Sequence, residues 1–176
     1  LLGALEVSES DVDAFSGTES VALLSDLGRS TFGARGASRA FLTEVSHVIE
    51  MAAWRADEGT LHAGFQELSR LWTDAEARRI YRRLAESGVD VHVYGVPDVD
   101  APAWDGLAVH GVGDDEISAS WFVVYDGGGD PDAKATLLAE EREPGTYHGF
   151  WTFQPDRTDE TLAYLDATYG DGGQSN

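Results

Sequence analysis

The chain has 176 residues and no cysteine. This length suits one domain with a proper hydrophobic core, and the lack of cysteine excludes disulfides, thiolate metal sites and cysteine nucleophiles. No apolar run approaches the ~20 residues of a membrane span, and no secretory signal opens the chain, so we expect no membrane contact. Because the sequence does not begin with Met, we take it to be a fragment or a processed product.

Charge is the strongest compositional feature. The 32 Asp and Glu residues outnumber the 12 Lys and Arg residues and give a net charge of -20. The acids are spread along the whole length, which favours a surface kept soluble by self-repulsion over an acidic interaction arm. Salt of molar strength screens such repulsion to about 3 Å, so the composition predicts a cytoplasmic protein of a salt-accumulating halophile. Direct nucleic-acid binding is disfavoured, because we find no basic patch for phosphate contacts.

The N-terminal segment, residues 1–37, has little regular pattern. Val21–Ser25 reads as a buried strand, whereas Gly28, Gly33 and Gly36 are expected to prevent a regular element after it. We therefore place the folded domain at residues 38–169 and a disordered tail at residues 170–176.

Two helices and a strand come next in chain order. Apolar residues recur at helical spacing from Phe41 to Ala53, and Gly59 suits the end of this helix. Its apolar stripe is also a surface on which a second protomer could pack, so a homodimer is one arrangement the pattern allows. Residues 61–72 also fit a helix face, but Gly64 weakens a helix there, so we favour a short strand over residues 62–65 that turns into a helix at about Gln66.

The next helix has the clearest start signal. Residues 73–76, Thr-Asp-Ala-Glu, form a capping box, in which the Thr hydroxyl and the Glu side chain satisfy free backbone N–H groups. An apolar stripe then runs to Gly88, which ends the helix. The stripe comprises Ala77, Ile80, Tyr81, Leu84 and Ala85.

The rest of the chain, from Val89 to Phe153, reads as strands, and a closing helix begins after Pro155. Short connections between the last three strands favour an antiparallel meander, because a parallel crossover needs about a dozen residues. The sequence therefore predicts an α/β fold with some α+β character. We expect a single mixed sheet of about five or six strands with helices packed on it.

A run of three glycines, residues 127–129, raises the question of a phosphate-binding loop. Such a loop needs Lys and then Ser or Thr after the last glycine, but Asp130 and Pro131 stand there instead. The acids Asp126, Asp130 and Asp132 do not keep the spacing of a calcium loop either. Glycine adopts positive φ at no steric cost, so we interpret this segment as a turn between two strands.

No catalytic or metal-binding signature is found elsewhere. Glu140 and Glu141 are adjacent on a strand and point to opposite faces, which makes them poor partners in acid–base chemistry. His92 and His110 lie on neighbouring predicted strands, but no cysteine can complete a metal site with them. We expect satisfied structural histidines, no metal and no catalytic residues.

Aromatic residues are the most suggestive feature of the strands. Tyr94, Trp121, Tyr125 and Trp151 all fall on strands, where they are either ordinary core residues or the lining of a pocket. In the second interpretation the pocket lies on one sheet face and is edged by His92 and Gln66.

Four segments in order, "LHAGFQELSR", "VDVHVYG", "SWFVVYDGGGD" and "GFWTF", resemble the DICT family of sensory domains, named for diguanylate cyclases and two-component systems. The resemblance covers roughly residues 38–169, and the acidic composition resembles the haloarchaeal branch. It implies sensing rather than catalysis, with the signalling output on another chain or in a part outside this sequence. The site residues that it implies are Phe65, Gln66, Ser69, Arg70, Tyr94, Trp121 and Trp151.

Two functions are consistent with these observations. The first is a signal-input domain that binds a small ligand or chromophore and passes the change to a signalling or regulatory partner; the cofactor, if any, is unknown. The second is an interaction module without a ligand, which holds its partner through edge strands or a helix stripe. A hydrolase built on scattered Asp, His and Arg residues is a third and weaker alternative.

The charge pattern gives a direct test. We expect the free energy of unfolding to rise as KCl is raised from low to molar concentration, because screening removes the self-repulsion of 20 excess negative charges. Thermal unfolding across a KCl series measures this. Stability that falls over the same range would contradict the halophilic interpretation.

Overall fold

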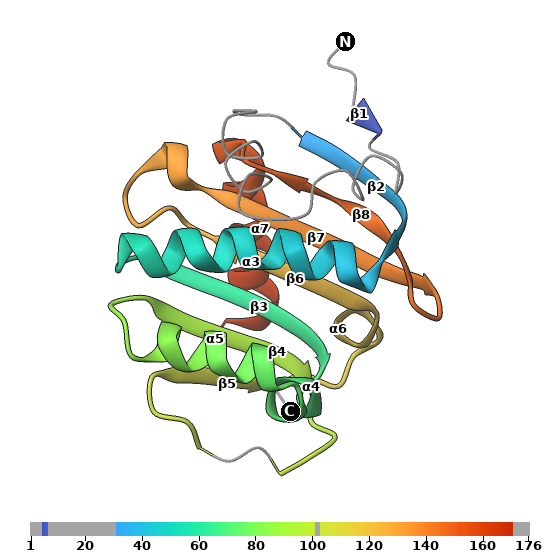
Figure 1. Ribbon diagram of the computed structural model, residues 1–176, viewed down its shortest axis with the longest axis horizontal. Coiled ribbons are helices and arrows are strands. Elements are labelled where there is room, and N and C mark those ends of the chain that lie inside the picture. The colour runs from blue at the N-terminus through green and yellow to red at the C-terminus, as the bar shows by residue number, and fades with distance from the viewer. Residues whose placement is uncertain (1–4, 7–30, 101–102, 171–176) are drawn as a thin grey trace.

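The computed structural model describes residues 5–6, 31–100 and 103–170, and its centre is one mixed sheet (Figure 1). The sheet has eight strands in the order β1-β2-β8-β7-β6-β3-β4-β5. The strands are β1 (Leu5–Glu6), β2 (Thr31–Ser38), β3 (Thr60–Glu67), β4 (Asp90–Val96), β5 (Leu107–Gly111), β6 (Ser120–Tyr125), β7 (Ala135–Glu143) and β8 (Thr146–Thr152). The expected fold class is confirmed, with more strands than expected.

Among the described residues, five α-helices and one short 3₁₀-helix accompany the strands. They are α3 (Arg39–Ala56), α4 (Ser69–Thr73), α5 (Ala75–Ala85), α6 (Asp115–Ala119), α7 (Pro155–Tyr169) and η1 (Pro131–Ala133). The strand expected at residues 21–25 lies outside the described residues, as does the expected tail apart from Gly170.

At strand β3 the sheet changes from parallel to antiparallel pairing. It pairs in parallel with β4 and antiparallel with β6. The parallel step is made by α4 and α5, as such a crossover requires. On the other side, β6, β7 and β8 form the expected antiparallel meander, and β2 extends it with antiparallel pairing to β8.

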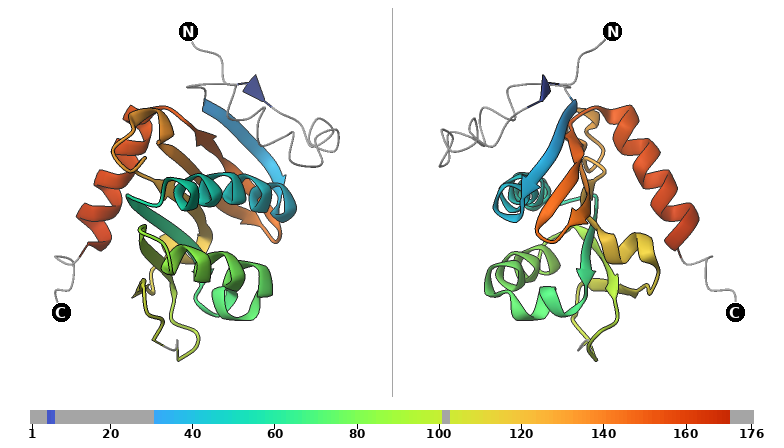
Figure 2. Two further views of the ribbon diagram at one scale, coloured as in Figure 1. Left: turned by 60° about the vertical axis from the view of Figure 1, so that its left-hand side comes forward. Right: turned by 90° about the vertical axis from the view of Figure 1, so that its right-hand side faces the viewer.

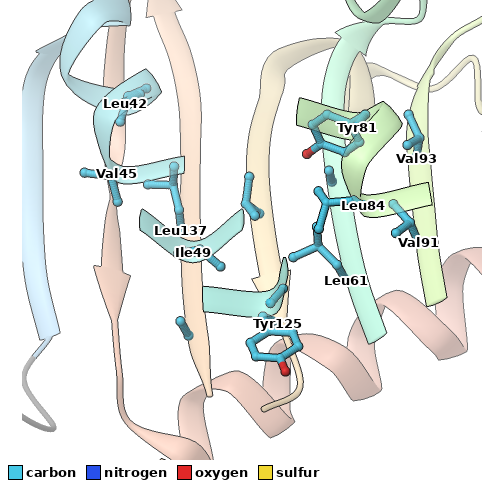
Figure 3. Close-up of a cluster of buried hydrophobic side chains, with 14 of the residues drawn as sticks. Leu42, Val45, Ile49, Leu61, Tyr81, Leu84, Val91, Val93, Tyr125 and Leu137 are labelled. Carbon is cyan, nitrogen blue, oxygen red and sulfur yellow. The ribbon is translucent and has the colours of Figure 1, made fainter. Parts of the chain in front are cut away.

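Helices cover both faces of the sheet (Figure 2). Helices α3, α4 and α5 lie on one face, called here the α3 face, and α6 and α7 lie on the other, called here the α7 face. The larger core lies on the α3 face, where side chains from α3 and α5 point onto β3, β4, β6 and β7 (Figure 3). Leu42 and Ile49 of α3 and Leu84 of α5 are at most 1% exposed.

The apolar stripe of α3 packs against the core of its own chain. Leu42, Val45, Ile49 and Ala53 belong to the core cluster of the α3 face. The expected packing of this stripe on a second protomer is therefore wrong, because the stripe already packs on the sheet of its own chain.

Three local expectations need correction. Residues 31–38 form strand β2 although Gly33 and Gly36 lie in it, because antiparallel pairing to β8 outweighs the low strand propensity of glycine. Helix α6 stands where only strands and loops were expected; it has five residues and depends on Asp114, which accepts the N–H of Ile117 at 2.8 Å. The cap of α5 is Asp74 rather than the residue before it.

The position of that cap has a physical reason. The carboxylate of Asp74 accepts the backbone N–H groups of Glu76 at 2.8 Å and Ala77 at 3.1 Å. The hydroxyl of Thr73 donates instead to the Ser69 carbonyl, at 2.9 Å, within α4. A single carboxylate oxygen therefore takes the role expected of the Thr hydroxyl.

The three glycines form the expected turn between β6 and β7. All have positive φ, between 58° and 91°. The turn is fixed to the start of β3 by Asp126, whose carboxylate accepts the N–H groups of Thr60 and Gly128, each at 2.9 Å. Tyr125 adds a hydroxyl bond to the Glu58 carbonyl at 3.0 Å. This end of the sheet is thus tied to the end of α3 by side chain and backbone together.

Candidate functional site

The nine residues expected at the site do not come together. Four of them, Phe65, Gln66, Arg70 and Trp121, line one cavity on the α3 face. Tyr125 and Trp151 are buried in the core of the same face, where Trp151 packs edge-on against Phe41 with ring centroids 5.1 Å apart.

The remaining three lie elsewhere. The backbone N–H of Ser69 donates to the Asp98 carboxylate at 2.9 Å. His92 and Tyr94 are on the α7 face. The expectation of a single aromatic face edged by both His92 and Gln66 is therefore wrong, because β4 presents these side chains on the side of the sheet opposite to Trp121.

The cavity has a volume of about 100 Å³ and lies between α3, α5 and the carboxyl end of β3. Strands β3 and β6 form its floor, α3 forms one wall, and α4 and α5 form the other. The lining residues are Arg39, Thr43, Ser46, His47, Glu50, Ala63, Gly64, Phe65, Gln66, Arg70, Asp74, Glu76, Ala77, Tyr81, Trp121, Phe122 and Val123.

Five lining residues that the sequence reasoning did not predict come from α3. Arg39, Thr43, Ser46, His47 and Glu50 recur at intervals of three or four residues and so form one polar stripe along the helix. The polar stripe can be seen in the sequence, because its residues have the same helical period as the apolar stripe and lie beside it. Ser46 and Glu50 of this stripe are buried, which places them inside the fold rather than on its surface.

Gln66 lies at one end of the cavity. It is 2% exposed and has a φ of 62°, a left-handed conformation that is costly for a residue other than glycine. The pairing of β3 with β4 shifts register between Gly64 and Glu67, so Gln66 sits in a bulge. The bulge turns the side chains of both Phe65 and Gln66 into the cavity, although adjacent strand residues normally face opposite ways.

Hydrogen bonds hold the Gln66 amide in place. Its nitrogen donates to Glu141 at 2.8 Å, and its oxygen accepts from Arg70 and, at 3.4 Å, from the Tyr147 hydroxyl. Arg70 also pairs with Glu67 at 3.3 Å. These contacts hold the side chains of Gln66 and Arg70 in place. They also supply hydrogen-bond donors to the carboxylates of Glu67 and Glu141.

Arg39 covers the indole of Trp121. Its guanidinium carbon lies 5.3 Å from the ring centroid, and the guanidinium donates to the Tyr147 hydroxyl at 3.1 Å. The indole N–H donates to Ser46 on α3 at 3.1 Å. Arg39 is the first residue of α3, where the helix dipole disfavours a cation, so these contacts rather than helix electrostatics fix its position.

Glu50 lies at the other end of the polar stripe and is 5% exposed. One carboxyl oxygen accepts the Tyr81 hydroxyl at 2.9 Å, which links α3 to α5. The second, Oε2, is buried and has no hydrogen-bond partner among the described residues. Burial raises the pKa of Glu50 from 4.5 to about 7; the Tyr81 bond opposes this rise and repulsion by Glu76 adds to it.

A separate cluster of rings occupies the α7 face. Nδ1 of His62 lies 3.0 Å from the Tyr94 hydroxyl, and Nδ1 of His92 lies 3.0 Å from Nε2 of His110. The rings stack, with centroids of His62 and His92 4.8 Å apart and those of Tyr94 and His110 4.5 Å apart. In the part of the chain that the structure describes, no three His, Asp or Glu side chains are placed to hold a metal ion.

The free energy of unfolding should depend on pH through the ionisation of Glu50. Its raised pKa means that its contribution is fully present below pH 4.5 and is lost as the pH rises to about 7. We expect Glu50→Gln to remove this loss, so that from pH 4.5 to 8 the variant gains on the order of 3 kcal/mol relative to the parent. Urea unfolding at a series of pH values measures the difference. The exposed Glu44→Gln on the same helix is the control, and parallel profiles of parent and Glu50→Gln would refute the assignment.

His62 should act in the opposite direction. Burial, together with repulsion by the neighbouring His92 and His110, lowers its pKa from 6.5 to about 4. The folded state thus favours neutral His62, so its contribution is present above pH 6.5 and is lost as the pH falls towards 4. We expect His62→Gln to flatten the acid side of the stability profile. His148→Gln on β8 is the control; an unchanged acid limb in His62→Gln would show that His62 is not the group responsible.

Comparisons with known proteins agree with the fold and identify the family. Among solved structures, a polyphosphate kinase from Porphyromonas gingivalis is similar at a TM-score of 0.50 and 14% identity, over 73% of this chain and 22% of the kinase. TrmBL2, an archaeal chromatin protein with a novel mode of DNA binding, is similar at a TM-score of 0.50 and 11% identity, over 92% of this chain and 62% of TrmBL2. The matched part is less than two thirds of either protein, and identity this low shows the fold alone.

No curated protein matches the chain. Among the described residues, no helix combines the length and the apolar character needed to cross a membrane. The profile of the sensory domain in diguanylate cyclases and two-component systems matches residues 22–142, which is more than half of the chain and begins before the expected domain start at residue 38. The chain therefore belongs to the DICT family of sensory domains.

Proposed function

We propose that this domain receives its signal by binding a small molecule in the cavity between α3 and α5. It binds the molecule without transforming it, and it passes the change to a signalling partner in the cytoplasm. The family supports the role of signal input. The position of the binding site rests on the cavity itself, which gathers Phe65, Gln66, Arg70 and Trp121 of the family-like segments.

One observation supports a ligand more than any other. Glu50 lines the cavity, and its Oε2 is buried and has no hydrogen-bond partner among the described residues. An unsatisfied buried polar atom costs about 1–3 kcal/mol, and more when it is charged. A ligand that donates a hydrogen bond to this oxygen would remove that cost, which makes Glu50 a natural anchor.

The same carboxyl offers a route for the signal. Through its other oxygen Glu50 accepts the Tyr81 hydroxyl, so it connects the wall made by α3 to the wall made by α5. A ligand bound at Oε2 would change the charge and hydrogen bonding of this contact. The relative packing of the two helices is then the quantity that a partner reads.

The rival function is an interaction module without a ligand. Its support is the position of β5 at one edge of the sheet, where β5 pairs with β4 on one side only. An exposed strand edge is a common docking surface for another chain. The two functions differ in whether the cavity residues matter.

Trp121 and Trp151 separate the proposals. Trp121 lines the cavity, whereas Trp151 is 2% exposed in the core. We expect Trp121→Phe to stay folded, with a loss of about 1 kcal/mol for the Ser46 hydrogen bond, and to lose ligand response. Trp151→Phe should lose stability through poorer packing yet keep its response once folded. The response is the thermal shift of each variant with small-molecule extract from a salt-accumulating host, and native mass spectrometry identifies the bound mass.

The outcomes are distinct. A bound mass and a thermal shift that disappear in Trp121→Phe but persist in Trp151→Phe would support the ligand-binding function. A parent protein with neither a bound mass nor a shift would refute it. Capture of a defined partner that is indifferent to both substitutions would then favour the interaction module.

A further inference from the structure

We propose, building on the proposed ligand-binding function, that the ligand of this cavity is a small organic nitrogen cation, an ammonium or amidinium head on a short apolar stem. The geometry points to Glu50 as its counter-ion, through the carboxyl oxygen Oε2. Four observations support this assignment. They are the missing hydrogen-bond donor at Glu50, the charge around Glu50, the aromatic walls of the cavity and the volume of the cavity.

The hydrogen-bond demand at Glu50 is for a donor. Oε1 already accepts the Tyr81 hydroxyl at 2.9 Å, and Oε2 is left without a donor among the described residues. The ionised carboxylate, the form that a bound cation favours, accepts and cannot donate, so it would repel an anionic ligand group placed here. Ammonium and amidinium groups supply N–H donors together with the compensating charge.

The charge around Glu50 is not balanced by the protein. In the described part of the chain, no Lys, Arg or His nitrogen pairs with its carboxyl, while Glu76 repels it. The two arginines of the cavity have acidic neighbours of their own. Arg70 pairs with Glu67 at 3.3 Å. Hydrogen bonds from the Gly145 N–H and the Gln66 amide lower the pKa of Glu141, and Arg70 and Arg39 add to this lowering. When Glu50 is ionised, its negative charge therefore lies at the cavity and is paired with no cation among the described residues.

The walls beside Glu50 also suit an organic cation. Tyr81 and Phe65 line the cavity with their rings in edge contact at 5.1 Å, and Trp121 lines the floor. Aromatic rings attract cations placed near their faces and pack well against alkyl stems. An alkali-metal ion is a poorer fit, because hard cations prefer several oxygen ligands and no three acidic or His side chains of the described residues converge.

Size limits the ligand to a short head. The cavity volume is about 100 Å³. An engineered apolar cavity of about 150 Å³ holds benzene, so a head of about four or five non-hydrogen atoms fits here. A longer molecule would have to extend through the mouth of the cavity.

Three probes of equal length and different charge test this proposal. Propylamine, propan-1-ol and propionate are added to the full chain in molar KCl, and binding is measured by saturation-transfer NMR and by the thermal midpoint. We expect propylamine to give saturation transfer and to raise the midpoint, and the other two to do neither. Glu50→Gln should weaken propylamine binding about ten-fold or more, as loss of a charged hydrogen bond predicts.

Glu44→Gln makes the same change of charge on an exposed part of α3 and should bind propylamine like the parent. Glu50→Met, which keeps the length of the side chain without its acceptors, provides a second variant should Gln impair folding. Equal binding of propylamine by Glu50→Gln and Glu44→Gln would overturn the proposal. So would propionate or propan-1-ol binding as well as the amine, although the cavity would then still be a ligand site.

Absence of binding by all three probes to the parent would also overturn the cation assignment. The extract experiment with Trp121→Phe stands apart from this outcome, because it assumes no ligand charge. Failure of the ligand class is thereby distinguished from failure of the sensory function itself.

Discussion

Strand β3 is bound in opposite senses by its two neighbours, and the rest of the fold depends on this constraint. Its parallel pairing with β4 requires a crossover, which α4 and α5 make on the α3 face. Its antiparallel pairing with β6 requires no helix on that side. The remaining space on this face is covered by α3, which enters from β2. Two helices of different origin therefore meet above one strand, and the cavity lies where they meet.

This arrangement also explains the polar character of the cavity. Helix α3 packs its apolar stripe on the meander side of the sheet and turns a second stripe, from Arg39 to Glu50, towards the crossover. The bulge at Gln66 adds an amide from the sheet itself. Arginine is suited to such a site, because a planar guanidinium can cover an indole and donate to a hydroxyl at the same time, as Arg39 does. Most cavity contacts thus join elements that are distant in sequence.

Much of the fold could be predicted from the sequence, because its signals are local. Helical periodicity located α3 and α5, alternation located β4, and short connections between strands predicted the meander. Local signals failed where tertiary contacts decide. Strand β2 exists because β8 pairs with it, and α6 is too short to show a period. The cap at Asp74 differs by one residue from the expected one, which is the usual uncertainty of a helix boundary.

The candidate site was predicted less well than the fold, also for a physical reason. Alternation assigns faces within one strand but does not relate the faces of two strands, which depends on their pairing. The sequence therefore grouped His92 and Tyr94 with Trp121, although β4 presents them on the opposite side. Apolar periodicity alone does not reveal the polar residues of α3. Glu50 could have been recognised as unusual, since a carboxylate inside an otherwise apolar helix pattern is rarely buried without a purpose.

Helix α3 is anchored after its C-terminal end, so a change in its tilt displaces its N-terminal end most. Asp126 and Tyr125 fasten the connection after α3. At its start, α3 joins β2 and is held through the Arg39 side chain, which contacts Trp121 and Tyr147. An 18-residue helix is about 27 Å long, so a tilt of about 5° about its fastened end moves the other end by about 2 Å. A small adjustment near Glu50 is thereby magnified at the junction of α3 with β2, on the far side of the domain from the glycine turn.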